Sequence, residues 1–455
     1  MIDVWIWLVV LVLPWVAGTA LVFALDARLT LNDGAYASAC GYVLGLVLAA
    51  TLYALQLRFL GLSSPHGAAA VLVGVALAAA LVIQQRSRPA ISIVGSHPSK
   101  KSAWWYFFLA LVVFKVLLLA YEAVRQPVLS WDAWTTWLMR SRVWVESGVY
   151  VPFTDTLTAL ASSGYAIEAW RYPELVSWLA AWAAAWSDGW NESHAVLPWV
   201  GLAVALPLGL YGALRRAELA ATPAMVAAWV LVSLPLVATH VAMTGYADLW
   251  LATSLSLGLM SAFHWLRTRH HADLLLTLLL VLAAAAMKPE GLVWASVFPL
   301  AYLASRLGSK IFLASAAAGL LLMLVLFQLE GLRLTLPVLG SVTFGWPASL
   351  TELGWHLWVY DNWHLLFWGL GAALAVALLA LSRYDISPAR LGLLAWVVFS
   401  LGGFLFLFLW TDSAEWARLG TANNRVMLQL VPGLVFWLAI ELTQNPLLAR
   451  LTRPT

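Results

Sequence analysis

The chain has 455 residues, of which 63% are hydrophobic and only 10% are charged, and its formal net charge is +3. Soluble domains carry about 25% charged residues, so this composition excludes a soluble globular protein and indicates a polytopic membrane protein. The few, dispersed positive charges also exclude a nucleic-acid-binding surface. Cys40 is the only cysteine, so no internal disulfide is possible.

Apolar segments of about 17–25 residues recur along the chain, which is the length that a helix needs to cross about 30 Å of hydrocarbon. Helices are expected because backbone polar groups cannot stay unpaired in lipid. The first segment lacks a preceding basic region and is long enough to span, so no cleaved signal peptide is predicted. We predict an all-α protein with about thirteen spans, at roughly 4–25, 36–60, 67–84, 103–124, 195–213, 221–243, 248–265, 272–287, 291–305, 311–329, 363–382, 389–410 and 425–441.

The basic residues predict the orientation of these spans. Strict alternation puts fifteen of the 25 lysines and arginines on one side, and 16 of the 22 acidic residues on the other. Because basic residues concentrate in cytoplasmic loops, the first side is predicted to be cytoplasmic. The outer face is then the better place to look for chemistry. The fifteen basic residues are Arg28, Arg86, Arg88, Lys100, Lys101, Arg215, Arg216, Arg267, Arg269, Arg306, Lys310, Arg383, Arg390, Arg450 and Arg453.

The long outer loop, 125–194, is predicted to contain two amphipathic helices that lie in the membrane interface. The first, from Asp132 to Glu146, places tryptophans on one face, and Asp132, Thr136 and Arg140 on another. The second, from Glu174 to Trp186, repeats leucine and tryptophan at helical spacing. An alternative is that the second helix spans the membrane, which would invert every later loop and break the charge rule.

The most informative single residue is Asp132, in the sequence Ser130-Trp131-Asp132-Ala133-Trp134. It opens the longest non-spanning stretch, just beyond the outer end of a span. A carboxylate beside the bilayer, flanked by tryptophans and followed by Arg140, suits proton transfer on a lipid-borne substrate. The alternative interpretation is an interfacial anchor with a solvated acid.

Other charged clusters recur at outer span ends. They are Arg171-Tyr172-Pro173-Glu174, Thr244-Gly245-Tyr246-Ala247-Asp248, Lys288-Pro289-Glu290-Gly291 and Asn423-Asn424-Arg425-Val426. Each has a purely structural alternative. Asp248 could cap a helix, Lys288 and Glu290 could be an ion pair ending two helices, Arg425 could anchor to lipid phosphate, and Arg171 could be a surface charge. No spacing of histidine, cysteine and carboxylate indicates a metal site.

Taken together, these clusters indicate one kind of chemistry. Cationic side chains near the membrane surface can hold a phosphate or diphosphate, and a carboxylate can accept a proton from a hydroxyl nucleophile. Soluble nucleotide sugars are not available outside the cytoplasm. An activated sugar would therefore arrive on a lipid phosphate.

Over about residues 103–441 the chain resembles the glycosyltransferase C superfamily, membrane enzymes that use polyprenyl-phosphate sugars and include protein O-mannosyltransferases and lipid A aminoarabinose transferases. The matching features are Trp-Asp-Ala-Trp in the first large outer loop, two interfacial helices, Tyr-Pro before the second helix, Gly-Tyr-Ala-Asp, Lys-x-Glu-Gly and a late Arg followed by Pro. The family pattern often begins with the catalytic loop after the first span, whereas here three further spans precede. The second acid of the metal-dependent oligosaccharyltransferases is not evident beside Asp132.

The resemblance implies Asp132 as catalytic base and Arg425 as a ligand of the donor phosphate. Lys288 is predicted to share the phosphate, and a metal or other cofactor is not expected. The predicted partners are a polyprenyl-phosphate sugar donor, membrane lipids, and a hydroxyl acceptor on a glycan, lipid or protein. The predicted location is a bacterial inner membrane, with the site on the periplasmic face. The predicted substrate-binding residues are Arg140, Arg171, Tyr172, Tyr246, Asp248 and Glu290.

We divide the chain into N-terminal spans with a basic cytoplasmic loop (1–102), a catalytic transmembrane module (103–441, with outer loops 125–194 and 330–362) and a cytoplasmic tail (442–455). Three other functions remain open. A ligase for polyprenyl-diphosphate-linked glycans would share most features. A flippase for lipid-linked glycans would need ionisable residues along its spans. A structural subunit would need no converging charges.

Overall fold

The computed structural model describes residues 4–86, 101–162, 164–326, 328, 331–336, 340–344 and 349–451. Helices dominate this part of the chain. Its strands form two short pairs: β1 (Phe153–Thr154) is parallel to β2 (Tyr165–Ala166), and β3 (Arg333–Leu336) is antiparallel to β4 (Gly340–Thr343). The all-α class is therefore confirmed. Arg88 and Lys100, parts of the 330–362 loop and the end of the tail lie outside the described residues.

The chain divides into two compact units, which we treat separately. Unit 1 comprises Met1–Ser233 and Ala238–Ser254. Two helices, α12 (Pro235–Ala242) and α13 (Asp248–Thr268), contribute residues to both units. The other helical elements of unit 1 are α1 (Val4–Trp7), η1 (Leu8–Val12), α2 (Leu13–Leu25), η2 (Leu31–Asp33), α3 (Gly34–Leu60), α4 (His66–Arg86), α5 (Ala103–Arg125), η3 (Ala133–Trp137), α6 (Leu138–Ser147), α7 (Thr156–Ala161), α8 (Leu175–Ala184), α9 (Glu192–Ala195), α10 (Leu197–Arg216) and α11 (Ala221–Ser233).

Unit 2 comprises Leu234–Val237 and Leu255–Thr455. Its core pairs are α15 with α19 and with α14, and α18 with α22. Its remaining helical elements are α14 (His271–Ala285), α15 (Pro289–Leu307), α16 (Ser309–Leu326), α17 (Leu350–Gly354), η4 (Trp355–Val359), α18 (Leu366–Arg383), α19 (Pro388–Trp410), α20 (Ala414–Arg418), α21 (Asn423–Leu428), α22 (Val431–Gln444) and α23 (Pro446–Leu451).

Eight described helices are long and apolar enough to cross a membrane, or nine if α11 and α12, bent by 62°, form one span. The prediction of about thirteen spans is not confirmed. The segments that fall short are 272–287, 291–305, 311–329 and 425–441. One physical reason is length, since α14 has 15 residues and so extends only about 22 Å. Another is interruption, since 425–441 divides into α21 and α22 at Gln429–Leu430.

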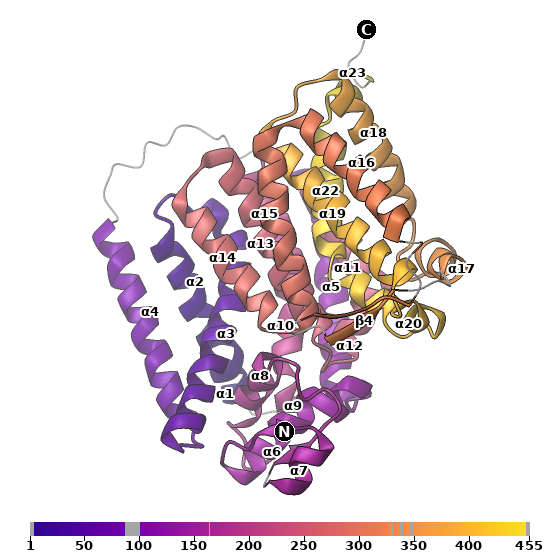
Figure 1. The fold of residues 1–455 in the computed structure, drawn as a ribbon. Coiled ribbons are helices and arrows are strands. Elements are labelled where there is room, and N and C mark those ends of the chain that lie inside the picture. The colour runs from indigo at the N-terminus through magenta and orange to yellow at the C-terminus, as the bar shows by residue number, and fades with distance from the viewer. Residues whose placement is uncertain are drawn as a thin grey trace. The chain divides into compact units, whose positions relative to one another are not determined.

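Small residues hold α2 against α3, two helices that run side by side in Figure 1. A Cβ added to Gly41 would lie 2.5 Å from Cα of Thr19, and one added to Gly18 would lie 2.8 Å from Cα of Gly45. Between apolar helices in lipid, packing replaces the hydrophobic effect as the main attraction, and small residues let the backbones approach. Only glycine therefore fits this seam.

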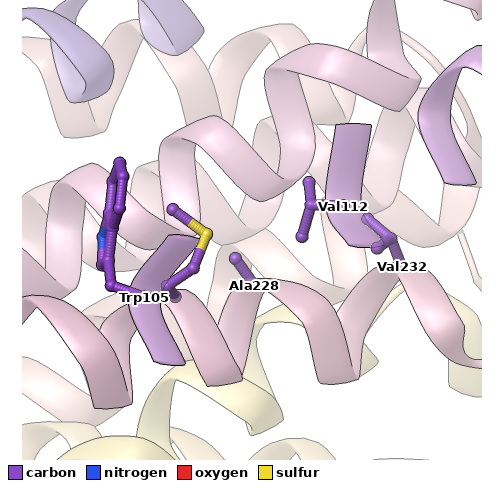
Figure 2. Packing of buried hydrophobic residues seen from close by; sticks show 5 residues of the cluster. Trp105, Val112, Ala228 and Val232 are labelled. Atoms are coloured by element: carbon purple, nitrogen blue, oxygen red, sulfur yellow. The ribbon is translucent and has the colours of Figure 1, made fainter. Parts of the chain in front are cut away.

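Helix α5 packs on α11 through a seam at helical spacing. Trp105 and Val112, two turns apart on α5, meet Met225, Ala228 and Val232 of α11, and all five are buried (Figure 2). Positions separated by three, four or seven residues share one face of a helix. The seam fixes the span that leads into the long loop of unit 1.

The spans of unit 1 alternate as the sequence predicts. At one end, Arg216 lies 3.5 Å from Asp33 and 4.0 Å from Asp26, and the Ser102 hydroxyl lies 2.8 Å from that of Thr222. All of these residues are at ends predicted to be cytoplasmic. At the opposite end, which we call the loop end (126–191 and 243–248), predicted outer segments contact one another. Which end faces the cytoplasm stays a prediction.

The two interfacial helices differ from their predicted form. Helix α8 is buried on every side from Val176 to Ala184, so it is a core helix and not an amphipathic one. With 10 residues it is also too short to span. In the first helix Trp134 is exposed, whereas Thr136 and Arg140 are buried. Thr136 and Arg140 share the buried face with Trp137 and Trp144 at ordinary helical spacing.

The first three spans belong to the same unit as the long loop. Helix α3 packs against α8 and α10, and the indole of Trp182 donates a hydrogen bond to the carbonyl of Val10 (3.2 Å). The division of the chain by contacts falls between Ser254 and Leu255, within α13. In structural terms, these spans are a scaffold for the loop.

Candidate functional site

Asp132 lies in the helical turn that leads into η3, at the loop end of unit 1. The turn begins at Ser130, whose carbonyl accepts hydrogen bonds from the amides of Ala133 (3.1 Å) and Trp134 (3.4 Å). Asp132 has helical dihedrals (φ −62°, ψ −28°), and its side chain makes no capping bond to η3. Asp132 is half-buried, and Trp131 and Trp134 near it in the sequence are exposed. The carboxylate therefore does not serve to cap its own helix.

Neutral groups fix this turn against the segment that follows α12. The buried Ser130 hydroxyl donates to the carbonyl of Thr244 (2.6 Å). Gly245 adopts φ +97°, and a Cβ there would lie 2.5 Å from Cβ of Ala133. The sequence Thr244-Gly245-Tyr246 is thus pressed onto the Asp132 turn. The structure brings together two clusters that the sequence only identified separately.

The same segment positions Tyr246 and Asp248. The Tyr246 carbonyl accepts a hydrogen bond from the Trp199 indole (2.8 Å). The centroid of the Tyr246 ring lies 5.2 Å from that of the His240 ring. Asp248 is fully buried at the first residue of α13. A buried carboxylate at a helix N-terminus is favoured by the helix dipole. Both residues lie within a few positions of the Gly245 contact with the Asp132 turn.

Arg140 is buried and bonded to backbone. Its Nη1 donates to the carbonyls of Tyr172 (2.9 Å) and Pro173 (3.4 Å), and its Nη2 to those of Ala169 (3.0 Å) and Trp170 (3.0 Å). Burial lowers the pKa of Arg140, and the charge of Glu174 opposes that shift; arginine stays charged nonetheless. The guanidinium therefore shapes the loop that carries Tyr172, which is a positioning task.

The other two predicted residues of this loop have different surroundings. Arg171 is exposed, and its guanidinium lies 4.9 Å from the centroid of the Trp170 ring. The Tyr172 ring packs 5.7 Å from that of Trp137, which follows the Asp132 turn. Of the two, Tyr172 is the one held near η3.

Sequence reasoning missed a cluster around Glu174. Its carboxylate accepts hydrogen bonds from the Tyr150 hydroxyl and the Trp178 indole, both at 3.2 Å, and lies 3.9 Å from Nη1 of Arg58. The Arg58 guanidinium also stacks 4.3 Å from the Tyr150 ring centroid. Burial raises the pKa of Tyr150, with Glu174 adding to the shift. The available signal was Arg58 itself, a basic residue at an outer span end.

In unit 2, Lys288 and Glu290 form an ion pair of 3.0 Å where α15 begins. Lys288 is buried, and one oxygen of the Glu290 carboxylate is buried with no hydrogen-bond partner among the described residues. A Cβ on Gly291 would lie 2.2 Å from the carbonyl oxygen of Ala284, so α14 and α15 are in close contact here. The ion-pair alternative for these two residues is thus correct as a description of their contact.

Arg425 lies on α21, partly buried, between two anchored polar residues. The amide of Asn424 lies 2.7 Å from Nδ1 of His356, and Gln429 accepts a hydrogen bond from the Trp294 indole (2.7 Å). Trp294 is one helical turn beyond Glu290 on α15, and Gln429 follows Arg425 by a similar step. Unit 2 therefore joins the segments that carry Lys288 and Arg425.

The described residues contain no group of three histidine, cysteine or acidic side chains that could hold a metal ion. Metal independence stays a prediction. Comparisons with protein-family models, curated proteins and solved structures find no match to the chain.

Proposed function

We propose that the chain is a membrane glycosyltransferase that moves a sugar from a polyprenyl phosphate to a hydroxyl acceptor, with inversion at the anomeric carbon. The observation that carries the proposal is the Asp132 turn. A carboxylate that does not cap its helix is presented by a turn that neutral contacts hold in place. A carboxylate that is held at a fixed place in the chain is suited to act as a general base.

In the proposed reaction Asp132 accepts the proton of the acceptor hydroxyl as its oxygen bonds to the anomeric carbon. The bond from that carbon to the phosphate oxygen breaks, and its electron pair leaves with the polyprenyl phosphate. The transition state is expected to resemble an oxocarbenium ion. Arg425 and Lys288 would stabilise the charge on the leaving phosphate, an effect commonly worth about 2.7–4 kcal/mol per well-placed donor.

The remaining residues divide into two groups under this proposal. Tyr246, Asp248, Tyr172, Arg171 and Glu290 would bind sugar hydroxyls or orient the cationic groups. Arg140 is withdrawn from this set, because its two terminal nitrogens already bond backbone carbonyls. It acts through the loop of Tyr172.

The proposed location is a bacterial inner membrane with the loop end of unit 1 in the periplasm, supported by the side preference of the basic residues. A cysteine at the exposed Ser162 should react with an impermeant thiol reagent in cells whose outer membrane is permeabilised, and one at the exposed Ala27 should react only after lysis. The native Cys40 is buried and gives a low background. The opposite labelling pattern would overturn this location.

The decisive test of the function is Asp132→Asn, assayed as polyprenyl phosphate released from a panel of synthetic polyprenyl-phosphate sugars in the presence of envelope extract as acceptor. The amide keeps the shape but loses the basic carboxylate, so release should fall by about 10²–10⁴. Donor retention, measured by native mass spectrometry, should not change. Glu146→Gln is the matched control, since this exposed acid of the same loop pairs with Arg142. Near-normal turnover in the Asn variant would sink the base assignment.

A second test concerns Arg425. Lysine keeps the charge but loses the two-pronged contact of arginine with phosphate, so Arg425→Lys should weaken donor binding by about tenfold, the equivalent of one hydrogen bond to a charged group. Arg418→Lys, on the neighbouring α20, is the control. Unchanged donor binding in Arg425→Lys and Arg425→Ala would reduce Arg425 to a lipid anchor. If the lipid that co-purifies is a diphosphate-linked glycan, the ligase alternative replaces transfer from a monophosphate.

A further inference from the structure

Unit 2 contains an apolar pocket that the proposed reaction does not use. Its volume is about 230 Å³, and it lies among α13, α14, α15 and α19. Ala262, Ala301 and Gly392 line it, and their small side chains leave the space open. The Thr277 hydroxyl, which also lines it, donates to a backbone carbonyl of its own helix (2.8 Å). An apolar cavity of even about 150 Å³ stays dry and accepts hydrocarbon ligands.

The pocket is far along α15 from the residues assigned to the donor phosphate. Tyr302 lines the pocket, whereas Lys288 precedes the first residue of the same helix. At 1.5 Å per residue the two positions are separated by about 20 Å. The pocket therefore belongs to the opposite end of this unit, the end that the basic residues assign to the cytoplasm.

Two exposed arginines lie over aromatic rings of the pocket wall. The Arg267 guanidinium is 5.9 Å from the ring centroid of Phe263, and that of Arg269 is 5.4 Å from the ring of Trp265. Both rings line the pocket, and Trp265 also packs 5.1 Å from Tyr302, which is partly exposed. Positive charge is thus fixed at the end of a hydrocarbon-sized space.

The backbone at Arg269 has a conformation that is unusual for a residue other than glycine. Arg269 has φ +57°, a left-handed conformation that glycine usually occupies after a helix. A non-glycine residue there is uncommon and costs free energy. The nearby acid Asp273 is buried and accepts a hydrogen bond from Thr268 (3.0 Å). An arginine is kept at a position where glycine would be less strained.

From these contacts we infer a binding site for an anionic phospholipid, with one acyl chain in the pocket and the phosphate between Arg267 and Arg269. Apolar walls select hydrocarbon, and guanidinium groups pair with phosphate. A net negative headgroup is favoured because both exposed arginines on the pocket wall are cationic. The inference does not rest on the proposed sugar transfer.

The headgroup is tested first. The full-length protein, stripped of lipid in detergent, is offered equal amounts of phosphatidylglycerol and phosphatidylcholine with identical acyl chains, and bound lipid is counted by native mass spectrometry. Phosphatidylglycerol should be retained about tenfold over phosphatidylcholine, the equivalent of one charge-assisted bond. The double variant Arg267→Gln/Arg269→Gln should lose this preference. Arg306→Gln/Lys310→Gln, exposed at the same end, should keep it.

The chain site is tested by filling the pocket. Ala262→Phe and Ala301→Phe should each reduce retention of both lipids, whereas Leu303→Phe, on an exposed face of α15, should not. Equal retention of the two lipids by the wild type, or full retention in both pocket variants, would overturn the inference. So would displacement of phosphatidylglycerol by an equal amount of polyprenyl phosphate, which would make the pocket a donor-tail site. If the Phe variants fail to fold, the double variant of the exposed arginines still tests whether the headgroup preference depends on them.

Discussion

Two neighbouring regions of the long loop in unit 1 are held in opposite ways. Around Arg140, a charge holds the backbone, since its guanidinium nitrogens donate to carbonyls from Ala169 to Pro173. Around Asp132, neutral groups hold the backbone, through the Ser130 hydroxyl and the contact of Gly245 with Ala133. A charged residue near a candidate site can thus hold the backbone itself, as Arg140 does, or lie on a backbone that neutral groups hold, as Asp132 does.

The two regions also depend on different contributions to the free energy of folding. A guanidinium removed from water needs its hydrogen bonds restored inside the protein, and Arg140 meets most of that need with backbone carbonyls of segment 169–173. The turn of Asp132 instead depends on close packing, in which one extra methyl group is felt. Substitutions that remove hydrogen bonds should therefore destabilise the region around Arg140. Substitutions that add volume should destabilise the turn of Asp132.

The largest expected effect is on stability, from Arg140→Met. Methionine fills part of the space but removes the guanidinium donor from the partly buried carbonyls of Trp170, Tyr172 and Pro173, and each unsatisfied buried group costs about 1–3 kcal/mol. We expect the free energy of unfolding, measured by detergent titration, to fall by about 3 kcal/mol or more. Segment 169–174 should also become sensitive to proteolysis.

The control for this variant is Arg142→Met. Arg142 is exposed and pairs with Glu146 at i,i+4 spacing (3.0 Å), so its loss should cost about 0.3–0.5 kcal/mol. Asp132→Asn should leave stability close to that of the wild type. If Arg140→Met proved no less stable than Arg142→Met, the contrast between the two regions would be lost.

Much of the fold was predictable because it depends on repeated, local signals. Long apolar segments such as 36–60 and 389–410 are helices, and the alternation of charged ends recurs in the contacts of Arg216 with Asp26 and Asp33. The count of about thirteen spans is not confirmed, because some apolar helices such as α14 are short and others are interrupted, as at Pro235 and at Gln429–Leu430. Hydropathy is averaged over a window of residues, so a local break in a helix does not change it, although the break interrupts the helix itself.

The candidate site was predictable in composition but not in arrangement. The residue types at Asp132, Tyr246 and Arg140 were all identified, yet nothing in the sequence indicates a π-helical turn after Asp132. The sequence also did not indicate that Arg140 shares the buried face of Trp137 and Trp144. The contact between Ser130 and Thr244 joins segments 114 residues apart, and a single sequence carries no local signal for such a contact. Gly245 was quoted only as part of a motif, and its role depends on that contact.

A smaller effect is expected at Gly245, and it tests the packed side of the comparison. Gly245→Ala forces alanine into φ +97° and places its methyl group 2.5 Å from Cβ of Ala133 and 2.9 Å from the Ser130 hydroxyl. Gly189 is a matched control in the same unit, because it has φ +92° but open space around its Cβ position.

Gly189→Ala should therefore report backbone strain alone, about 1–2 kcal/mol, whereas Gly245→Ala adds a steric overlap that costs about 1–3 kcal/mol more. Because that overlap displaces the Asp132 turn, sugar transfer should fall in Gly245→Ala and not in Gly189→Ala. Unfolding and transfer measured on both variants decide the point. Equal losses of stability with unchanged transfer would mean that the close contact of Gly245 with Ala133 does not position Asp132.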